Sequence, residues 1–356
     1  MRRFRRSIVA GFMVLGFLLG GAGLKTAAGE ATKFVADWVI GAKHAPFLLA
    51  RDKGFYKKAG LDVAIERGYG SGAAGQLLAT GKADFSFVDL GSMVILRTKG
   101  AKLKQVAAIH AIFPIGYVGL RSKGIREPKD MAGKTFGGSP VASSSYLLPT
   151  YLKNVGVDPG SVKLLHMKIT SIVPSFLAGT IDLMGVYTIN SVPIIRYNLR
   201  QKGIDPDKEL SLFLGVDIGI DAYSNGLTVR DDTIRDKPEL VRRWVRATMD
   251  AFRSSVQNPK ESLDNFMAKH PEINKVIAAD EFDAMIRSLL SPEARQTALG
   301  WTVERKVGIT QEIMFESGQA QGGKLPLKDL YTNEFLEKRP MAEAEIPPNY
   351  RRLGLK

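Results

Sequence analysis

The chain has 356 residues, 45% of them hydrophobic and 24% charged, so it can bury a large core and form two lobes. It contains no cysteine, which excludes disulfides, thiolate metal sites, a cysteine nucleophile and a lipidated cysteine anchor. The formal charge is +14, but the basic residues are scattered and form no run with interleaved aromatics, so we expect no nucleic-acid partner.

Residues 1–29 have the three-part layout of a cleaved secretory signal peptide. The basic segment MRRFRRS precedes a glycine-rich apolar run that is short for a membrane span, and then the small residues of LKTAAGEA. An uncleaved anchor is the alternative. We expect cleavage near Ala28 to Ala31 and a periplasmic location. The remaining 45 basic and 36 acidic residues give a charge of +9, which favours an anionic ligand or surface.

After the leader, short apolar strands alternate with helices, which is typical of parallel α/β sheets. The segment PFLLARDKG is expected to form a helix that begins near Pro46 and ends at Gly54, because proline fits the first turn and glycine ends a helix. The other elements expected up to residue 122 are strands at 33–39, 61–66, 83–88, 104–112 and 116–122, and helices at 73–81 and 91–100.

A second lobe is expected over residues 122–222, and the chain then returns to the first. Residues 32–121 and 223–320 would make up lobe one, and residues 321–356 a C-terminal extension. Beyond Lys237 the pattern is mostly helical, most strongly in ELVRRWVRATMDAFRSSVQ. The elements expected in lobe two and its exit are helices at 143–157, 171–179 and 191–203 and strands at 135–138, 162–167, 182–186, 210–215 and 225–230.

The two lobes share a local pattern: LATGKADFSFVDLGS can be aligned with FLAGTIDLMGVYTIN. In both, a helix ends at glycine, a turn carries aspartate, and an apolar strand leads into a loop. A chance likeness of a common helix–glycine–strand pattern is the alternative. Two similar lobes with crossings near Arg121 and Tyr223 would face each other across a cleft at the carboxyl ends of their strands. The matched pairs are Gly81 and Gly179, Asp84 and Asp182, and Val88 and Val186.

Four segments carry a family resemblance: HAPFLLARDKGFYKKAGLDV, LLATGKADFSFVDLGS, GIREPKDMAGKTFGGS and LPTYLKNVGVD. Together they resemble the periplasmic solute-binding proteins of ABC importers, in particular the sulfonate-, taurine- and pyrimidine-precursor-binding group, over about residues 33–260. This group shares its fold with the thiamine-pyrimidine synthases of fungi. The resemblance implies a two-lobe α/β fold with mostly parallel sheets flanked by helices, a hinged cleft, a helical C-terminal part, a membrane ABC permease as partner and a monomeric state.

The candidate ligand-binding residues of lobe one lie at strand ends and helix starts. Trp38 could stack on a flat ligand or belong to the core. His44 could hydrogen-bond a ligand or be a satisfied buried histidine. In GYGSGAA, Ser71, Gly72 and Ala73 would offer free N–H groups that favour anions. The remaining candidates, which equally cap the following helix, are Asp89 and Ser92.

In lobe two, GGSPVASSS offers hydroxyl and amide donors at a helix start, although serines also cap helices without any ligand. Relatives that bind aminopyrimidines often carry an acid near Asn190, and the segment YTINSVP has none, which weakens the aminopyrimidine interpretation. Asp221 and Tyr223 would line the cleft or stabilise the hinge. The candidates of this lobe are Ser139, Ser143, Ser144, Ser145, Tyr187, Asn190, Asp221 and Tyr223.

No catalytic, metal or cofactor motif is present: the four histidines lack H-E-x-x-H spacing, and there is no Walker lysine, G-x-G-x-x-G or G-x-S-x-G. The synthases of this fold carry a cysteine-rich motif, which this chain lacks. We therefore expect no enzyme and no cofactor, but the extracytoplasmic binding component of an importer for a small anionic, sulfonate- or carboxylate-like solute. The alternatives are a pyrimidine-precursor-binding protein and a ligand sensor for a membrane receptor.

Overall fold

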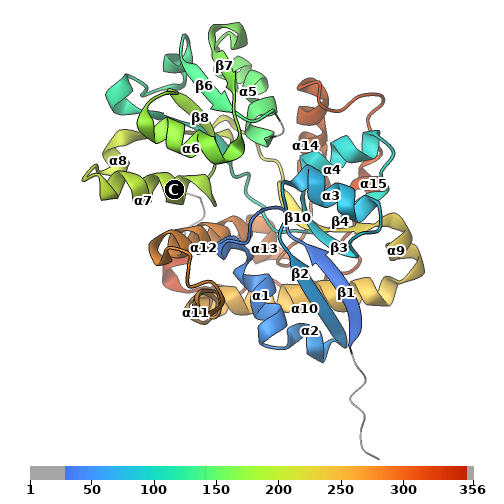
Figure 1. The fold of residues 1–356 in the computed structure, drawn as a ribbon. Helices are drawn as coiled ribbons and strands as arrows, with labels where there is room; N and C mark the ends of the chain where they lie inside the picture. Colours follow the sequence, from blue (N-terminus) through green and yellow to red (C-terminus); the bar gives the residue numbers. More distant parts are fainter. Residues whose placement is uncertain (1–28, 141, 351–356) are drawn as a thin grey trace, which may run out of the picture.

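The computed structural model describes residues 29–140 and 142–350, so the predicted signal peptide lies outside the described residues. Figure 1 shows two lobes, one below and one above, connected through the middle of the molecule. Within the described ranges, no helix is both long and apolar enough to cross a membrane.

Lobe one is built on a five-stranded sheet with the order β2-β1-β3-β10-β4. Four of its strands come from the first part of the chain, and β10 inserts between β3 and β4 after the chain has returned from lobe two. The strands are β1 (Glu30–Val35), β2 (Leu61–Glu66), β3 (Phe85–Asp89), β4 (Leu103–Ala108) and β10 (Asn225–Arg230).

Lobe two is built on a second five-stranded sheet with the order β7-β6-β8-β5-β9. The strands are β5 (Ile115–Leu120), β6 (Thr135–Gly138), β7 (Lys163–His166), β8 (Leu183–Tyr187) and β9 (Leu210–Leu214).

The two sheets have the same topology, which confirms the repeat predicted from the sequence. In each sheet one strand runs antiparallel to both of its neighbours, β10 in lobe one and β5 in lobe two, and the other pairings are parallel. The matched aspartates have matched contacts: Asp84 accepts a hydrogen bond from the Lys33 N–H at 2.8 Å, and Asp182 accepts one from the Thr135 N–H at 3.0 Å. Each aspartate therefore anchors the neighbouring central strand of its own sheet.

The first crossing lies earlier than we predicted. Strand β5 pairs with β8 and β9 of the second sheet, so the chain leaves lobe one within residues 109–114 rather than near Arg121. The sequence pattern placed both strands in lobe one because β4 and β5 are apolar strands joined by a short connection, which is also the pattern of neighbouring strands in one sheet. The second crossing, residues 215–224, includes Tyr223 as expected.

Helices cover both faces of each sheet, as the predicted fold class requires. In lobe one, α1, α10 and α11 pack on one side, and α3, α4 and α14 on the other; in lobe two, α5 packs opposite α6 and α7. The α-helices are α1 (Ala45–Asp52), α2 (Phe55–Lys58), α3 (Ser71–Ala79), α4 (Leu90–Thr98), α5 (Ser143–Asn154), α6 (Ile169–Ala178), α7 (Ser191–Gln201), α8 (Pro206–Glu209), α9 (Asp231–Asp236), α10 (Pro238–Gln257), α11 (Pro259–Lys269), α12 (Lys275–Leu289), α13 (Pro292–Gln296), α14 (Glu304–Glu316) and α15 (Leu327–Leu330).

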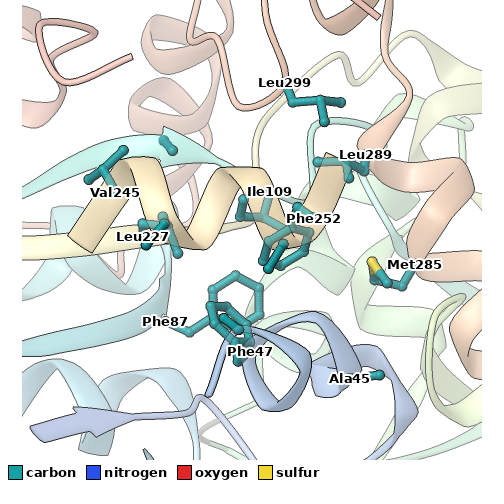
Figure 2. Close-up of a cluster of buried hydrophobic side chains, with 14 of the residues drawn as sticks. Ala45, Phe47, Phe87, Ile109, Leu227, Val245, Phe252, Met285, Leu289 and Leu299 are labelled. Carbon is teal, nitrogen blue, oxygen red and sulfur yellow. The ribbon is translucent and has the colours of Figure 1, made fainter. Parts of the chain in front are cut away.

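The core of lobe one joins residues that are far apart in the sequence. Trp244 of α10 stacks on Phe85 of β3 at 4.0 Å between ring centroids, and both side chains are fully buried. Figure 2 shows side chains of α1, β3, β10, α10 and α12 meeting in the same cluster. Phe335 and Ile346 also belong to it, so the predicted C-terminal extension packs as part of lobe one.

Candidate functional site

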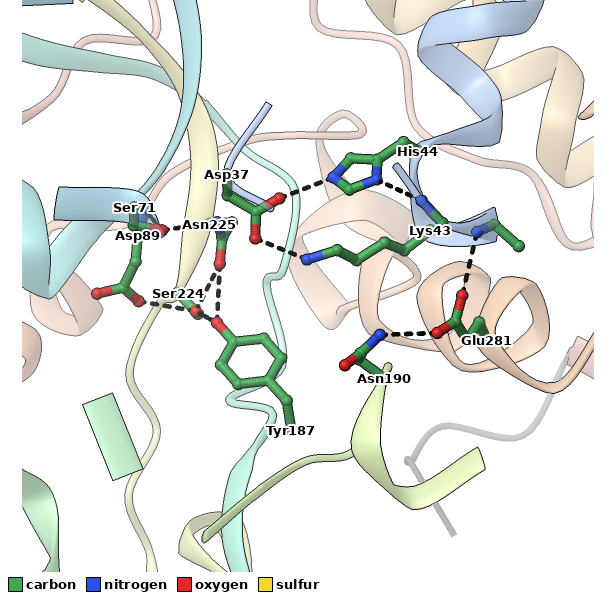
Figure 3. A network of polar contacts seen from close by, with 12 residues as sticks. Asp37, Lys43, His44, Ser71, Asp89, Tyr187, Asn190, Ser224, Asn225 and Glu281 are labelled. Atoms are coloured by element: carbon green, nitrogen blue, oxygen red, sulfur yellow. Dashed lines mark hydrogen bonds and ion pairs between the residues drawn. The ribbon is translucent and has the colours of Figure 1, made fainter. Parts of the chain in front are cut away.

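The polar residues between the lobes gather where the strand ends of both sheets meet. Strands β1 and β3 present their carboxyl ends there, and the antiparallel β10 presents its amino end. The carboxyl end of β8 approaches from lobe two (Figure 3). Two clusters, described below, occupy this position.

The first cluster joins an aspartate, a lysine and a histidine that are almost completely buried. Asp37 lies in the loop after β1, and Lys43 and His44 lie in a 3₁₀ turn, Ala42–His44, before α1. One carboxylate oxygen of Asp37 lies 2.6 Å from Lys43 Nζ, and the other lies 2.7 Å from His44 Nε2. His44 Nδ1 accepts a hydrogen bond from the Gly41 N–H at 3.2 Å. Both imidazole nitrogens of His44 are therefore engaged within the protein.

The surroundings of this cluster set its charges. Burial alone raises the pKa of Asp37, but the charge of Lys43 and the hydrogen bond from His44 outweigh it, so the pKa lies below its ordinary value. Burial lowers the pKa of His44, although the hydrogen bond to Asp37 acts in the opposite direction. The cluster is thus a buried Asp37–Lys43 ion pair beside a neutral imidazole.

The second cluster links α3, α4 and β10. The Ser71 hydroxyl accepts hydrogen bonds from the Asp89 N–H at 3.1 Å and from the Asn225 amide at 3.3 Å. The Asp89 carboxylate accepts one from the Ser92 N–H at 2.9 Å and one from the Ser224 hydroxyl at 2.8 Å. Burial raises the pKa of Asp89, although the hydrogen bonds that the carboxylate accepts lower it. Asp89 therefore caps α4 and faces the cleft at the same time.

Polar side chains of lobe two bridge to lobe one. The Tyr187 hydroxyl of lobe two lies against the Ser224 hydroxyl and donates to Asn225 Oδ1 at 2.8 Å. The Asn190 amide, at the start of α7, donates to Glu281 of α12 at 2.7 Å. A third contact joins Arg200 and Asp280 at 3.5 Å on the surface.

A small pocket of about 10 Å³, which is room for about one water molecule, lies beside the second cluster, between α4, α5, α14 and the two crossings. Most of its lining is apolar or aromatic, and Asp89 is the ionisable carboxylate in it. Within the described ranges, no lysine or arginine lines this pocket. The lining residues are Asp89, Gly91, Phe113, Ile115, Ser143, Tyr146, Leu147, Ala222, Thr310, Ile313 and Met314.

Several predicted residues are brought together at this position. His44, Ser71, Asp89, Ser92, Tyr187 and Asn190 belong to the two clusters and the bridges described above. The half-buried Trp38 ring lies near Gly70, on the loop that precedes α3. Ser143 begins α5 and lines the pocket.

Other predicted residues lie away from the clusters. Gly72 and Ala73 are exposed on the first turn of α3. Ser139 and Ser145 are buried near β6, and the Ser144 carbonyl accepts a hydrogen bond from Tyr117 at 3.0 Å.

The two candidates at the second crossing have contacts of a hinge. Asp221 pairs with Lys306 at 3.1 Å and also contacts Arg305. The buried Tyr223 hydroxyl accepts a hydrogen bond from the Val303 N–H at 3.0 Å. These contacts tie the crossing to α14 and its preceding loop, in line with the stabilising role that was one of the two alternatives.

Some residues of the clusters were absent from our predictions. Asp37 and Lys43 neighbour predicted residues, and the position of Asp37 just after a strand was a usable signal. Ser224 and Asn225 lie at the amino end of β10, where the rule that ligands bind at the carboxyl ends of strands gives no signal. Glu281 lies on a distant helix without any motif. It supplies an acid beside Asn190, where the sequence of lobe two offers none.

The buried Glu281 should make stability depend on pH. Burial raises its pKa from 4.5 to about 7, although hydrogen bonds from the Ala42 N–H and Asn190 oppose the shift. The folded protein therefore holds this proton where the unfolded chain has lost it, so the contribution of Glu281 to stability should fall by about 3 kcal/mol as pH rises from about 4.5 to about 7. The buried His44 and His110, whose pKa values are lowered, act in the opposite direction, so the test compares variants at each pH. In urea titrations across this window, the difference in free energy of unfolding between wild type and Glu281→Gln should change by that amount, whereas the difference for the exposed Glu316→Gln should stay constant. A constant difference for Glu281→Gln would contradict the assignment.

A family model described as NMT1/THI5 like matches residues 41–262, more than half of the chain. The chain belongs to this family. The match spans both predicted crossings and all of the two clusters except Asp37, and the bridging residue Glu281 also lies outside it.

Relatives of several kinds resemble this family member. The riboflavin-binding protein RibY of Chloroflexus aurantiacus is 23% identical over 84% of this chain and 84% of its own length. The formylaminopyrimidine-binding protein of Halalkalibacterium halodurans is 23% identical over 69% of this chain and 72% of its own. A 4-amino-5-hydroxymethyl-2-methylpyrimidine phosphate synthase of Schizosaccharomyces pombe is 22% identical over 70% of this chain and 72% of its own length. The names thus include binding proteins and an enzyme.

Solved structures confirm the fold. The periplasmic aliphatic sulphonate-binding protein SsuA of Escherichia coli has a TM-score of 0.64 at 13% identity, covering 88% of this chain and 95% of SsuA. The periplasmic nitrate-binding protein NrtA of Synechocystis has a TM-score of 0.61 at 13% identity, covering 90% of this chain and 91% of NrtA. The chain therefore has the solute-binding fold of sulfonate and nitrate importers.

Proposed function

We propose that this protein is the extracytoplasmic solute-binding component of an ABC importer, and that its lobes close on one small solute and present it to a membrane permease. The observation that carries this proposal is the convergence of both lobes on the same polar clusters. Tyr187 and Asn190 of lobe two contact Asn225 and Glu281 of lobe one. A ligand in the cleft would touch groups of both lobes and so favour closure over opening.

The geometry favours binding over catalysis. The cluster of Asp37, Lys43 and His44 resembles a catalytic group, but both nitrogens of His44 are hydrogen-bonded and Lys43 is paired with Asp37. A general base needs a nitrogen that can accept a proton from the substrate and a pKa near the pH at which the enzyme works. In addition, no group of three or more acids and histidines within residues 29–140 and 142–350 is placed to hold a metal ion.

The charges of the cleft favour a neutral solute that carries hydrogen-bond donors over the anion that the sequence alone suggested. Three buried acids, Asp37, Asp89 and Glu281, lie at the lobe junction. The two buried lysines near it are already paired, Lys43 with Asp37 and Lys306 with Asp221. An anion would have to approach carboxylates without a free cation nearby, which costs free energy in a buried site. The net positive charge of the chain therefore lies elsewhere on the molecule.

The pocket lining and the relatives support the same ligand class. The pocket is lined by aromatic and aliphatic side chains with few polar groups, the composition usual for small-molecule sites, and it would have to widen as the lobes open to admit a heterocycle. Two relatives are named for the binding of riboflavin and formylaminopyrimidine, which are flat heterocycles with ring or exocyclic N–H donors. A nitrogen heterocycle is therefore the ligand class that we propose.

A thermal-shift panel tests this assignment. The purified protein is unfolded, refolded to remove any carried-over ligand, and melted with formylaminopyrimidine, riboflavin, butanesulfonate, benzoate or nitrate. A ligand at 100 times its Kd should stabilise the folded state by about 2.7 kcal/mol. We expect the melting temperature to rise with a heterocycle only. A rise confined to the anions would overturn the ligand class, and turnover of a heterocycle without stable binding would overturn the binding role.

A further inference from the structure

His110 is a buried polar residue that the clusters described above do not use. It lies in the first crossing, directly after β4, and its side chain is completely buried. Within the described ranges, neither of its ring nitrogens has a hydrogen-bond partner. The Asn225 side chain lies close enough to raise the pKa of His110, but its hydrogen bonds of good geometry are those to Ser71 and from Tyr187.

An unpaired imidazole at this position is costly if packing is its only role. A neutral imidazole has one donor and one acceptor, and each buried polar group without a partner costs about 1–3 kcal/mol. The ring of His110 packs edge-on against Phe87 with 5.1 Å between centroids, a contact that phenylalanine would make equally well. The polar atoms of His110 therefore have no structural role in the closed arrangement.

One aromatic neighbour of His110 comes from the other lobe. The ring of Tyr187 lies 6.0 Å from the imidazole, and its hydroxyl is held by Ser224 and Asn225. His110 itself is fixed to lobe one, because its backbone N–H donates to the Asn225 carbonyl at 2.8 Å. When the lobes separate, Tyr187 leaves with lobe two and His110 stays behind.

The imidazole is neutral, which restricts what it can recognise. Burial, and then the charge of Lys43, lower the pKa of His110 to about 3, whereas Asp37 and the Asn225 side chain act in the opposite direction. The neutral His44 and Tyr187 also lie near the ring, and at neutral pH the imidazole offers one donor and one acceptor. Such a ring pairs with a neutral amide or ring-nitrogen group and gains no charge attraction to an anion.

We propose that His110 is a ligand-binding residue in the floor of the cleft, uncovered when Tyr187 withdraws, and that it hydrogen-bonds a neutral nitrogen or carbonyl group of the solute. This inference rests on the proposed binding function and makes it more specific. It adds a residue of the hinge segment to the ligand contacts, and it explains why a histidine occupies a site that packing would give to phenylalanine.

The first test measures access to the imidazole and needs no ligand. Diethyl pyrocarbonate acylates neutral imidazoles, and peptide mass spectrometry resolves each histidine of the full-length protein. Tyr187→Ala should raise the acylation rate of His110 at least tenfold, whereas Tyr197→Ala, elsewhere on lobe two, should leave it unchanged. The exposed His166 serves as the internal standard. An unchanged rate at His110 in Tyr187→Ala would overturn the proposal.

The second test separates a ligand contact from a structural role. His110→Phe should raise the melting temperature of the ligand-free protein, because it removes two unpaired polar atoms, and should weaken binding of whichever heterocycle of the panel binds by at least tenfold. A lower melting temperature, or an unchanged Kd for that heterocycle, would overturn the role of His110. If the wild-type protein binds no member of the panel, the proposed ligand class fails, and the acylation rates and melting temperatures still decide whether His110 is a concealed cleft residue.

Discussion

Asp37→Ala should lower the free energy of unfolding by about 3–5 kcal/mol at pH 7, because it leaves a lysine and a histidine buried without their shared acceptor. Lys43 is 4% exposed, and His44 is fully buried. The Lys43 ammonium also lies 6.0 Å from the centre of the Tyr187 ring, a contact too weak to replace a carboxylate at 2.6 Å. Urea denaturation of the variant measures the loss, with Asp62→Ala, at an exposed position of β2, as the control.

A double variant distinguishes loss of the charge pair from loss of packing. Replacing both ends of the ion pair with apolar residues, in Asp37→Leu/Lys43→Met, removes the unpaired ammonium and leaves only His44 without its acceptor; apolar replacements of buried ion pairs are often neutral or stabilising. The double variant should therefore be more stable than Asp37→Ala. The assignment is wrong if the double variant is less stable than Asp37→Ala. It is also wrong if the free energy of unfolding of Asp37→Ala stays within about 1 kcal/mol of the wild-type value.

The pH dependence of the same pair provides an independent test. The pKa of Asp37 is lowered by folding, so its contribution to stability is complete above the ordinary value of 3.8 and is lost as pH falls through the value in the folded protein. The acid limb of the stability curve should therefore be shallower in Asp37→Ala than in the wild type. Glu281 acts in the other direction between about pH 4.5 and 7, so the two variants should alter different parts of the curve.

Local sequence patterns predicted the repeated architecture because each repeat has its own signals. The glycine after α6, Gly179, has a left-handed backbone with φ of 76°, and Gly81 after α3 has φ of 71°, a conformation that glycine adopts without strain. The aspartates that follow, Asp84 and Asp182, anchor equivalent strands. Patterns of this kind lie within a few residues of one another, so a single sequence reveals them.

The site was only partly predictable because its contacts are long-range. Asn225 enters it because β10 runs antiparallel between β3 and β4, which a strand pattern does not reveal. Glu281 reaches Asn190 only through the packing of α12 on α7. The overall charge suggested an anion, yet the charges of the cleft are set by a few buried residues whose neighbours come from both lobes. Composition averages over the surface and carries no information on that balance.

Trp244→Ala should destabilise lobe one by about 3–5 kcal/mol, because it leaves a large cavity in a well-packed core. The indole is fully buried and lies 4.0 Å from the ring of Phe85 and 6.1 Å from that of Phe34. It comes from the returning part of the chain, and the two phenylalanines come from the first part. The side chain therefore holds the two halves of a discontinuous lobe together, and its loss should lower the melting temperature of that lobe by roughly 10 °C.

Lobe two has its own core and should respond to different substitutions. Its hydrophobic clusters consist of residues between Tyr117 and Phe213, and Phe176 is fully buried in one of them. In scanning calorimetry, Trp244→Ala should move the transition of lobe one and Phe176→Ala that of lobe two, so that each variant separates two transitions. If both variants shifted one common transition equally, the lobes would unfold as one unit. The contacts of Tyr187, Asn190 and the two crossings would then couple the unfolding of the two lobes.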